Sequence, residues 1–159
     1  MSYTNADGLR VLTFGGQGEV IDRGVTESGT LVIDIADFTA IGSTFGAADI
    51  DVNKAVIPAG AVITSATLVM TTAATSGGAA TLTVGTYNAA GAAIDADGID
   101  AAVALTAIDG DGDVVRCDGA QAAGVVGYLT ADAHVGLIYG TAAYTAGAGK
   151  LIVEFKKLV

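Results

Sequence analysis

Short runs in which apolar and polar residues alternate dominate the sequence from residue 29 onward. In TLVIDIA, Leu31, Ile33 and Ile35 occupy every second position, which is the period of a strand buried on one face. Similar runs follow at 61–72, 80–88, 113–117, 133–140 and 150–156, and glycine, threonine and aspartate separate them. Roughly seven or eight short strands with turn signals between them predict an all-β fold, a two-sheet antiparallel sandwich of the jelly-roll type.

The inward positions of these runs supply the predicted hydrophobic core. After a turn at Pro58 and Gly60, the apolar side chains of the next run are assigned to one face, with Thr64 interrupting the pattern. Burying each large apolar side chain contributes roughly 1.5–3 kcal/mol. The predicted core comprises Leu31, Ile33, Ile35, Val62, Leu68, Met70, Leu82, Val84, Leu137, Leu151, Val153 and Phe155.

Residues 1–28 differ from the rest, because they contain many glycines and few apolar anchors. We expect them to form an extended N-terminal arm with at most one strand, at 9–14, because so glycine-rich a segment pays a high entropy for order. Residues 1–20 are therefore expected to be poorly ordered alone. Residues 29–159 form the predicted β-sandwich domain.

Three segments between the strands receive predictions of their own. Residues 37–53 form a long connection whose apolar anchors Phe38, Ile41 and Phe45 are expected to cover an open end of the core. Residues 99–107 are rich in alanine and leucine, which favours a short helix capped by Asp97. Residues 141–149 are expected to form a turn region.

The charge distribution excludes several classes of partner. The chain has 159 residues with 17 acidic and 7 basic side chains, a formal net charge of −10. Such a surface repels phosphate backbones and anionic lipid, so we expect neither nucleic acid nor membrane as a partner. Seven acids fall between Asp95 and Asp118, a stretch expected to be loop. No run of about 18 apolar residues suggests a transmembrane helix, and MSYTNADGLRVLTF has no export-signal pattern, so we expect synthesis and use without export.

The inventory of chemically active side chains is thin. The sequence has one histidine, His134, one cysteine, Cys117, and no tryptophan. A single cysteine forms no internal disulfide, and this one is interpreted as a small buried apolar residue. GGQG at 15–18 lacks the lysine of a phosphate-binding loop. We therefore assign no catalytic residue, no cofactor and no metal ligand, and expect that the protein is not an enzyme.

Two interpretations remain open for the aspartates of IDGDGDVV. Asp109, Asp111 and Asp113 alternate like the first ligands of a calcium loop. The EF-hand pattern would then need glycine at Val114 and glutamate at Ala120, so it is incomplete. The alternative is that the Asp-Gly pairs build a turn, since both residues tolerate positive φ.

Four phrases of the sequence resemble a known family. They are MSYTNADGLRVLTFGGQGEV, IPAGAVITSATLVM, AAIDADGID and TAAYTAGAGKLIVEF. They look like the small capsid decoration (cement) proteins of tailed bacteriophages, and the resemblance covers nearly the whole chain. It implies a structural β-sandwich protein, often trimeric, that binds the outside of the phage head and stabilises contacts between major capsid proteins.

The resemblance also implies where the protein acts and what it contacts. It would be made in the host cytoplasm and would reside on the exterior of the virion, with the major capsid protein and itself, as a homotrimer, as partners. The N-terminal arm would become ordered on the capsid. The predicted capsid-contact residues are Asn5, Asp7, Leu9, Arg10, Val11, Leu12, Phe14, Gln17 and Glu19.

Two other functions compete with this one. A carbohydrate-binding or adhesion module on a virion surface would need an exposed aromatic platform, which Tyr3, Tyr87, Tyr128, Tyr139 and Tyr144 would have to supply. A glycan hydrolase would need two carboxylates about 5–10 Å apart, whereas the aspartates here stand mostly beside glycine. We rank adhesion second and hydrolysis third.

Overall fold

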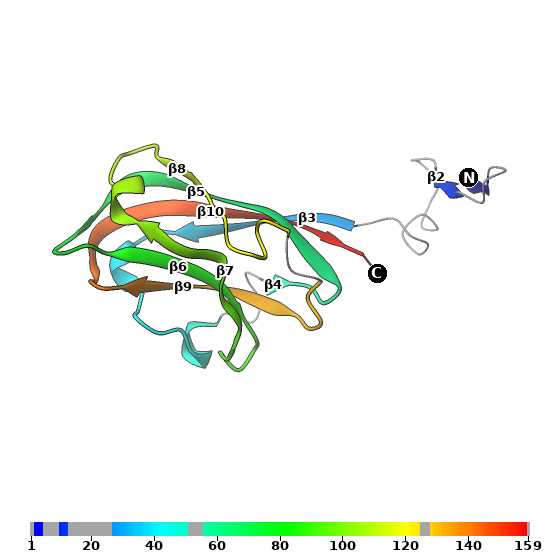
Figure 1. Ribbon diagram of the computed structural model, residues 1–159, viewed down its shortest axis with the longest axis horizontal. Coiled ribbons are helices and arrows are strands. Elements are labelled where there is room, and N and C mark those ends of the chain that lie inside the picture. Colours follow the sequence, from blue (N-terminus) through cyan, green and yellow to red (C-terminus); the bar gives the residue numbers. More distant parts are fainter. Residues whose placement is uncertain (1, 5–9, 13–26, 51–55, 125–127, 159) are drawn as a thin grey trace.

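The computed structural model describes residues 2–4, 10–12, 27–50, 56–124 and 128–158 (Figure 1). In the described residues, three 3-10 helices, η1 (Phe38–Ala40), η2 (Ala47–Asp49) and η3 (Leu105–Ala107), accompany the strands. No described helix has the length and apolar character needed to cross a membrane. The strands are β1 (Ser2–Thr4), β2 (Arg10–Leu12), β3 (Glu27–Ile35), β4 (Val56–Ile57), β5 (Ala61–Ser76), β6 (Thr81–Tyr87), β7 (Ala93–Ala104), β8 (Val114–Arg116), β9 (Ala133–Gly140) and β10 (Tyr144–Lys157).

Eight of these strands form two four-stranded antiparallel sheets. The first sheet has the order β3-β10-β5-β8, and the second sheet has the order β4-β9-β6-β7. Lettered B to I in chain order, the strands read BIDG and CHEF. This is the order of a jelly roll, in which an antiparallel ribbon of paired strands wraps around a core. The predicted fold class is therefore confirmed.

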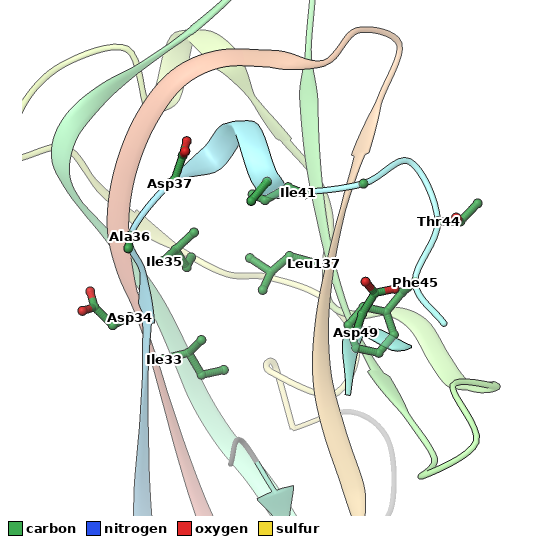
Figure 2. A pocket seen from close by; sticks show the side chains of 12 residues that line it. Ile33, Asp34, Ile35, Ala36, Asp37, Ile41, Thr44, Phe45, Asp49 and Leu137 are labelled. Carbon is green, nitrogen blue, oxygen red and sulfur yellow. The ribbon is translucent and has the colours of Figure 1, made fainter. Parts of the chain in front are cut away.

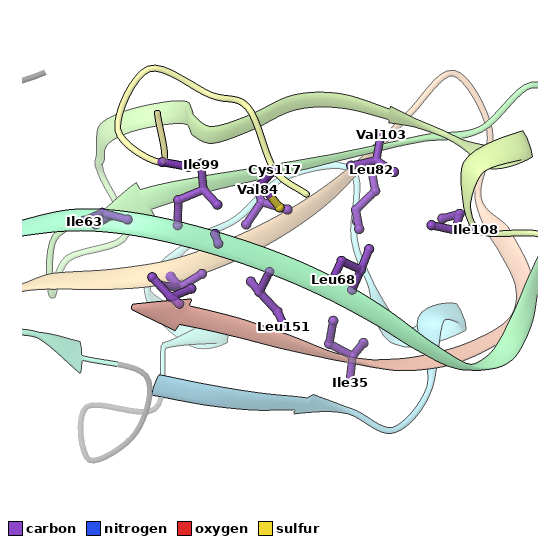
Figure 3. Packing of buried hydrophobic residues seen from close by; sticks show 14 of the residues in the cluster. Ile35, Ile63, Leu68, Leu82, Val84, Ile99, Val103, Ile108, Cys117 and Leu151 are labelled. Carbon is purple, nitrogen blue, oxygen red and sulfur yellow. The ribbon is translucent and has the colours of Figure 1, made fainter. Parts of the chain in front are cut away.

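The core lies between the two sheets, as Figure 3 shows for the packing of Leu68, Leu82 and Leu151. Leu68, Leu82, Val84, Leu151 and Val153 are fully buried, as alternation predicts. Leu31, Ile33, Leu137 and Phe155 pack against the core but remain partly exposed. Buried side chains missing from the predicted core include Ile57, Ile99, Val103 and Ile108.

Val62 was assigned to the core incorrectly, and a β-bulge explains the error. β10 pairs Glu154 with Ser65 but the next residue, Phe155, with Ile63, so Thr64 is an extra residue in β5. A bulge reverses which side chains point inward. Ala66, Leu68 and Met70 face the core after the bulge, whereas Ala61 and Ile63 do so before it and Val62 is only half-buried.

The predicted helix at 99–107 is wrong, because residues 93–104 form strand β7 and only 105–107 form a single 3-10 turn. Ile99 and Val103 are both buried and stand four positions apart, a spacing that suits one face of a helix and one face of a strand equally. The pairing with β6 shows one extra residue in β7 between Asp100 and Val103. Pairing with β6 outweighs the high intrinsic helix propensity of alanine, because tertiary pairing routinely overrides local propensity. The first part of the acid-rich stretch 95–118, which was expected to be loop, is therefore strand as well.

The predicted turn at 141–149 is wrong from Tyr144 onward, where β10 already begins. Register shifts in the pairing with β5 accompany this segment. Gly147 has a φ of 135° and approaches Phe38 so closely that a Cβ would lie 3.2 Å from the ring. The glycine thus permits an irregular strand where the sequence suggested a turn.

The anchors of the 37–53 connection reach different places. Phe38 is fully buried and meets Tyr144 edge to face, with 5.2 Å between ring centroids. Ile41 packs against the core and Phe45 against Tyr87. Phe38 and Ile41 therefore pack against the core as predicted, whereas Phe45 packs on the second sheet instead.

In the N-terminal segment, β1 and β2 pair antiparallel and belong to neither sheet of the sandwich. The prediction of at most one strand there is wrong, since alternation is undetectable in three-residue strands. β3 begins at Glu27, two residues earlier than expected.

Candidate functional site

A groove of about 410 Å³ opens beside β3, where the connection after this strand passes in front of β9 (Figure 2). Ile35, Ile41 and Leu137 point toward one another across it, while Asp34 points away. Among the described residues, β4 pairs with β9 at Ala133 and His134, and this pairing does not extend along β9 to Leu137. Ile35 and Leu137 were predicted as core residues, and Ile41 as an anchor of the 37–53 connection. Alternation along one strand does not reveal how far a neighbouring strand covers it, so it could not predict a groove here.

Two aspartates that line the groove accept hydrogen bonds from nearby backbone N–H groups. The carboxylate of Asp37 accepts a hydrogen bond from the backbone N–H of Thr39 at 2.8 Å. This hydrogen bonding, which involves both the side chain and the backbone of Thr39, lowers the pKa of Asp37. The carboxylate of Asp49 likewise accepts from the N–H of Gly46 at 2.9 Å. These carboxylates cap short helices, so the groove offers apolar walls rather than a reactive pair.

Cys117 has the environment of a structural residue. Its side chain is 3% exposed and packs in the core. Burial, with the charges of Asp100 and Asp118, raises the pKa of the thiol to about 12. Because the thiolate is the nucleophile, a thiol with so high a pKa is inert near neutral pH. The interpretation as a small buried apolar residue is confirmed.

Two aspartates of the 109–113 loop also accept hydrogen bonds from backbone N–H groups. Asp111 accepts from the N–H of Ala73 at 2.6 Å, and Asp113 accepts from the N–H of Gly110 at 2.7 Å. Gly112 has a φ of 84°, as a tight turn requires. Within the described part of the chain, no group of three or more potential ligands is placed to hold a metal ion. The geometry therefore fits the turn interpretation.

Acidic side chains gather along the bulged strand β7. Burial, together with a hydrogen bond and the charge of Asp97, raises the pKa of Asp95. Burial also raises the pKa of Asp100, against a hydrogen bond from the N–H of Ala102 at 3.1 Å. The neighbouring Gln121 accepts from the hydroxyl of Thr86 at 3.0 Å. These groups pack against the strand and its neighbouring loop.

His134 and the tyrosines do not form an exposed platform in the described structure. His134 is 5% exposed, and its Nδ1 atom has no hydrogen-bond partner. Tyr87 and Tyr144 are buried, and Tyr139 is half-buried. Among the tyrosines whose side chains are described, Tyr128 is the one that is mainly exposed. Sugar recognition by stacking would need several such rings on one face.

The predicted capsid-contact residues lie in the N-terminal segment. Arg10, Val11 and Leu12 form β2, where their backbone is described. The others lie outside the described residues: Asn5, Asp7, Leu9, Phe14, Gln17 and Glu19. The structure therefore brings three of the nine into one strand and leaves the contact role of all nine a prediction.

Comparisons with known proteins give one likeness in structure. No family model and no curated protein matches the sequence. Among solved structures, the chain is similar to the capsid of Ralstonia phage GP4, with 19% sequence identity and a TM-score of 0.49. The likeness covers 82% of this chain and 84% of that one. The jelly-roll assignment itself rests on the strand order of this chain.

Proposed function

We propose that the protein is a structural decoration protein of a tailed-phage head, which binds the outer surface of the shell and stabilises contacts between major capsid proteins. The four sequence phrases that resemble this family support the proposal. So does the placement of the polar groups, because the loop aspartates hold backbone and Cys117 is buried in the core. The proposed role needs neither turnover nor a cofactor.

The structural observation that carries the proposal is where the arm joins the sandwich. Residues 1–26 lead directly into β3, which is an edge strand of the first sheet. Because β1 and β2 pair with each other, the length that sets the reach is that of residues 13–26, which span at most about 46 Å when extended. An arm rooted at a sheet edge can therefore reach a neighbouring shell subunit while the sandwich rests on another.

Binding of this kind stabilises the shell by mass action. A ligand that binds only the assembled shell contributes RT ln(1 + [L]/Kd), about 2.7 kcal/mol per site at a hundredfold excess over Kd. One head offers many such sites, and their free-energy contributions add. A moderate affinity per site is therefore sufficient to resist internal DNA pressure.

The arm is tested by deletion of residues 1–14. Heads stripped of the protein are incubated with the full chain or the truncated chain and sedimented, and the bound protein is measured. We expect the truncated protein to unfold at the same temperature as the full chain but to be lost from the heads. Undiminished occupancy by the truncated protein would refute a clamping role for the arm.

We further propose that the protein assembles as a homotrimer, a state implied by the family resemblance. With −10 per chain, the acidic loops would have to lie away from the threefold axis, where salt screens them. Analytical ultracentrifugation at high concentration and moderate salt is expected to show three copies. A monomer there, together with density off the threefold axes of decorated heads, would contradict the proposal.

A further inference from the structure

The outer face of the first sheet carries a band of β-branched side chains open to solvent. The strand registers align Val32, Ile152, Thr67 and Arg116 in one row across the sheet, and Asp34, Lys150, Val69 and Val114 in the next. The β-branched side chains therefore run diagonally from Val32 to Val114, between the Asp34–Lys150 pair and Arg116. Val32 on β3 is 55% exposed and Val114 on β8 is 64% exposed. Since these two strands are the opposite edges of the sheet, the band crosses all four strands.

The outer face of the second sheet is built differently. Small residues such as Thr81, Thr83 and Gly136 occupy positions on that side of β6 and β9. The rings of Phe45 and Tyr87 lie over Gly136, where an added Cβ would meet both of them. The second sheet is therefore partly covered by the chain itself, whereas none of the described segments is seen to pack over the band on the first sheet.

Charge is distributed unequally between this face and the rest of the sandwich. The outer face of the first sheet holds Arg116, Lys150 and Lys156, against the carboxylates of Asp34 and Glu154. Lys150 and Asp34 pair at 3.4 Å. The other described residues from 27 onward hold one basic residue, Lys157, and eleven acidic ones. This face is thus the part of an acidic protein that approaches a carboxylate-bearing surface without repulsion.

The size of the band helps to identify its occupant. The four strands lie about 4.8 Å apart and the two rows span three residues of each strand, so the band covers roughly 200 Å². A stable interface needs about 800 Å² from each partner, so two copies joined through this face alone would dissociate. A partner that also binds the N-terminal arm would bury additional interface area. The arm precedes β3 of this same sheet, so one partner can contact the arm and the band together.

We propose that the outer face of the first sheet docks on the shell of the phage head, on a patch with an apolar centre and flanking carboxylates. The inference rests on the decoration role proposed above and extends the contact from the arm to the sandwich. The apolar centre of the patch meets the band from Val32 to Val114. The carboxylates meet Arg116 and Lys156, which face no described ion-pair partner.

The test compares matched charge insertions on the two sheets. Val32→Glu and Val114→Glu, made singly and together, place carboxylates in the band, and Ile94→Glu is the matched single change at a residue of β7 that is 42% exposed. Binding to stripped heads is measured by sedimentation, folding by thermal unfolding, and assembly by ultracentrifugation. We expect the double variant to bind at least about tenfold more weakly, and Ile94→Glu to bind like the native protein.

Two further variants keep the test decisive. Val32→Thr with Val114→Thr retains β-branching, so it remains folded if the glutamates unfold the sheet, and it is expected to bind more weakly as well. Arg116→Glu with Lys156→Glu is expected to weaken binding and to reduce its dependence on salt.

Three results would overturn the inference. Equal binding by native protein, band variants and Ile94→Glu would refute the docking face and leave the decoration role standing. A band variant that lowers the mass of the assembly in solution but binds heads normally would make the face a contact between copies of this chain. Failure of the native protein to bind stripped heads would refute the decoration role and the docking face together.

Discussion

The rings of Phe45 and Tyr87 lie 4.4 Å apart between centroids and at 38° to one another, and they fasten the connection after β3 to the second sheet. Gly136 makes room for them, because a Cβ at this position would lie 2.6 Å from Tyr87 Cε2 and 2.8 Å from Phe45 Cδ2. The covering of this sheet therefore depends on a glycine in the middle of β9.

Gly136→Ala is expected to lower the free energy of unfolding by about 1–3 kcal/mol, because the added methyl group must displace two packed rings. Gly77→Ala is the matched control, since a Cβ there meets nothing within 4 Å. Urea unfolding of both variants checks the prediction. Equal stability of the two variants would show that the rings move aside freely.

Alternation in the sequence was enough to predict the two-sheet fold and most of its core, because each buried face repeats every second residue. It failed where the period is broken. The bulge at Thr64 reverses the inward face of β5 and misplaces Val62. The spacing of Ile99 and Val103 suits a helix as well as a strand, so alternation did not exclude the helix there.

The candidate surfaces were harder to predict than the fold. Among the described residues, the groove lies at Leu137, beyond the pairing of β4 with β9, and the docking face depends on which strands are neighbours. Val32 and Val114 are far apart in the sequence and become parts of one band only through β10 and β5. Single-strand patterns contain no information on such lateral order.

Asp100→Asn is expected to stabilise the protein at pH 7. Burial raises the folded-state pKa of Asp100 above its usual value of 3.8, so the ionised carboxylate destabilises the fold at neutral pH. Below the usual pKa both states are protonated and the gain should vanish. Thermal unfolding at pH 7 and pH 3 tests this, with the exposed Asp109→Asn as control. A gain of equal size at pH 3 would exclude ionisation as its cause.

Tyr144→Phe is expected to leave stability at pH 7 unchanged or higher, because the buried hydroxyl has no hydrogen-bond partner and the ring contact with Phe38 remains. Burial raises the pKa of Tyr144 from 10.0 to about 12, so the native fold loses stability as pH rises from 10 toward 12, where the tyrosine ionises in the unfolded chain but not in the folded one. Tyr144→Phe should therefore lose less stability than the native protein over this interval. If Tyr128→Phe, at an exposed position, behaves identically, the prediction is wrong.

Removal of divalent cations is expected to have little effect. Asp111 and Asp113 accept backbone hydrogen bonds that make the 109–113 loop a turn without a cation. Thermal unfolding with EDTA or with added calcium should give midpoints that agree within error. A clear rise with calcium that Asp111→Asn abolishes would restore the calcium-loop interpretation.

The central claim, that this jelly-roll protein stabilises a phage head, is tested most directly by the temperature at which heads release their DNA. Heads stripped of the protein and the same heads after re-decoration are heated in parallel, and DNA release is followed with a dye that cannot enter intact heads. The account predicts release at a distinctly lower temperature from the stripped heads, with full recovery on re-decoration. Release at the same temperature from both would contradict it and would favour adhesion to a host surface.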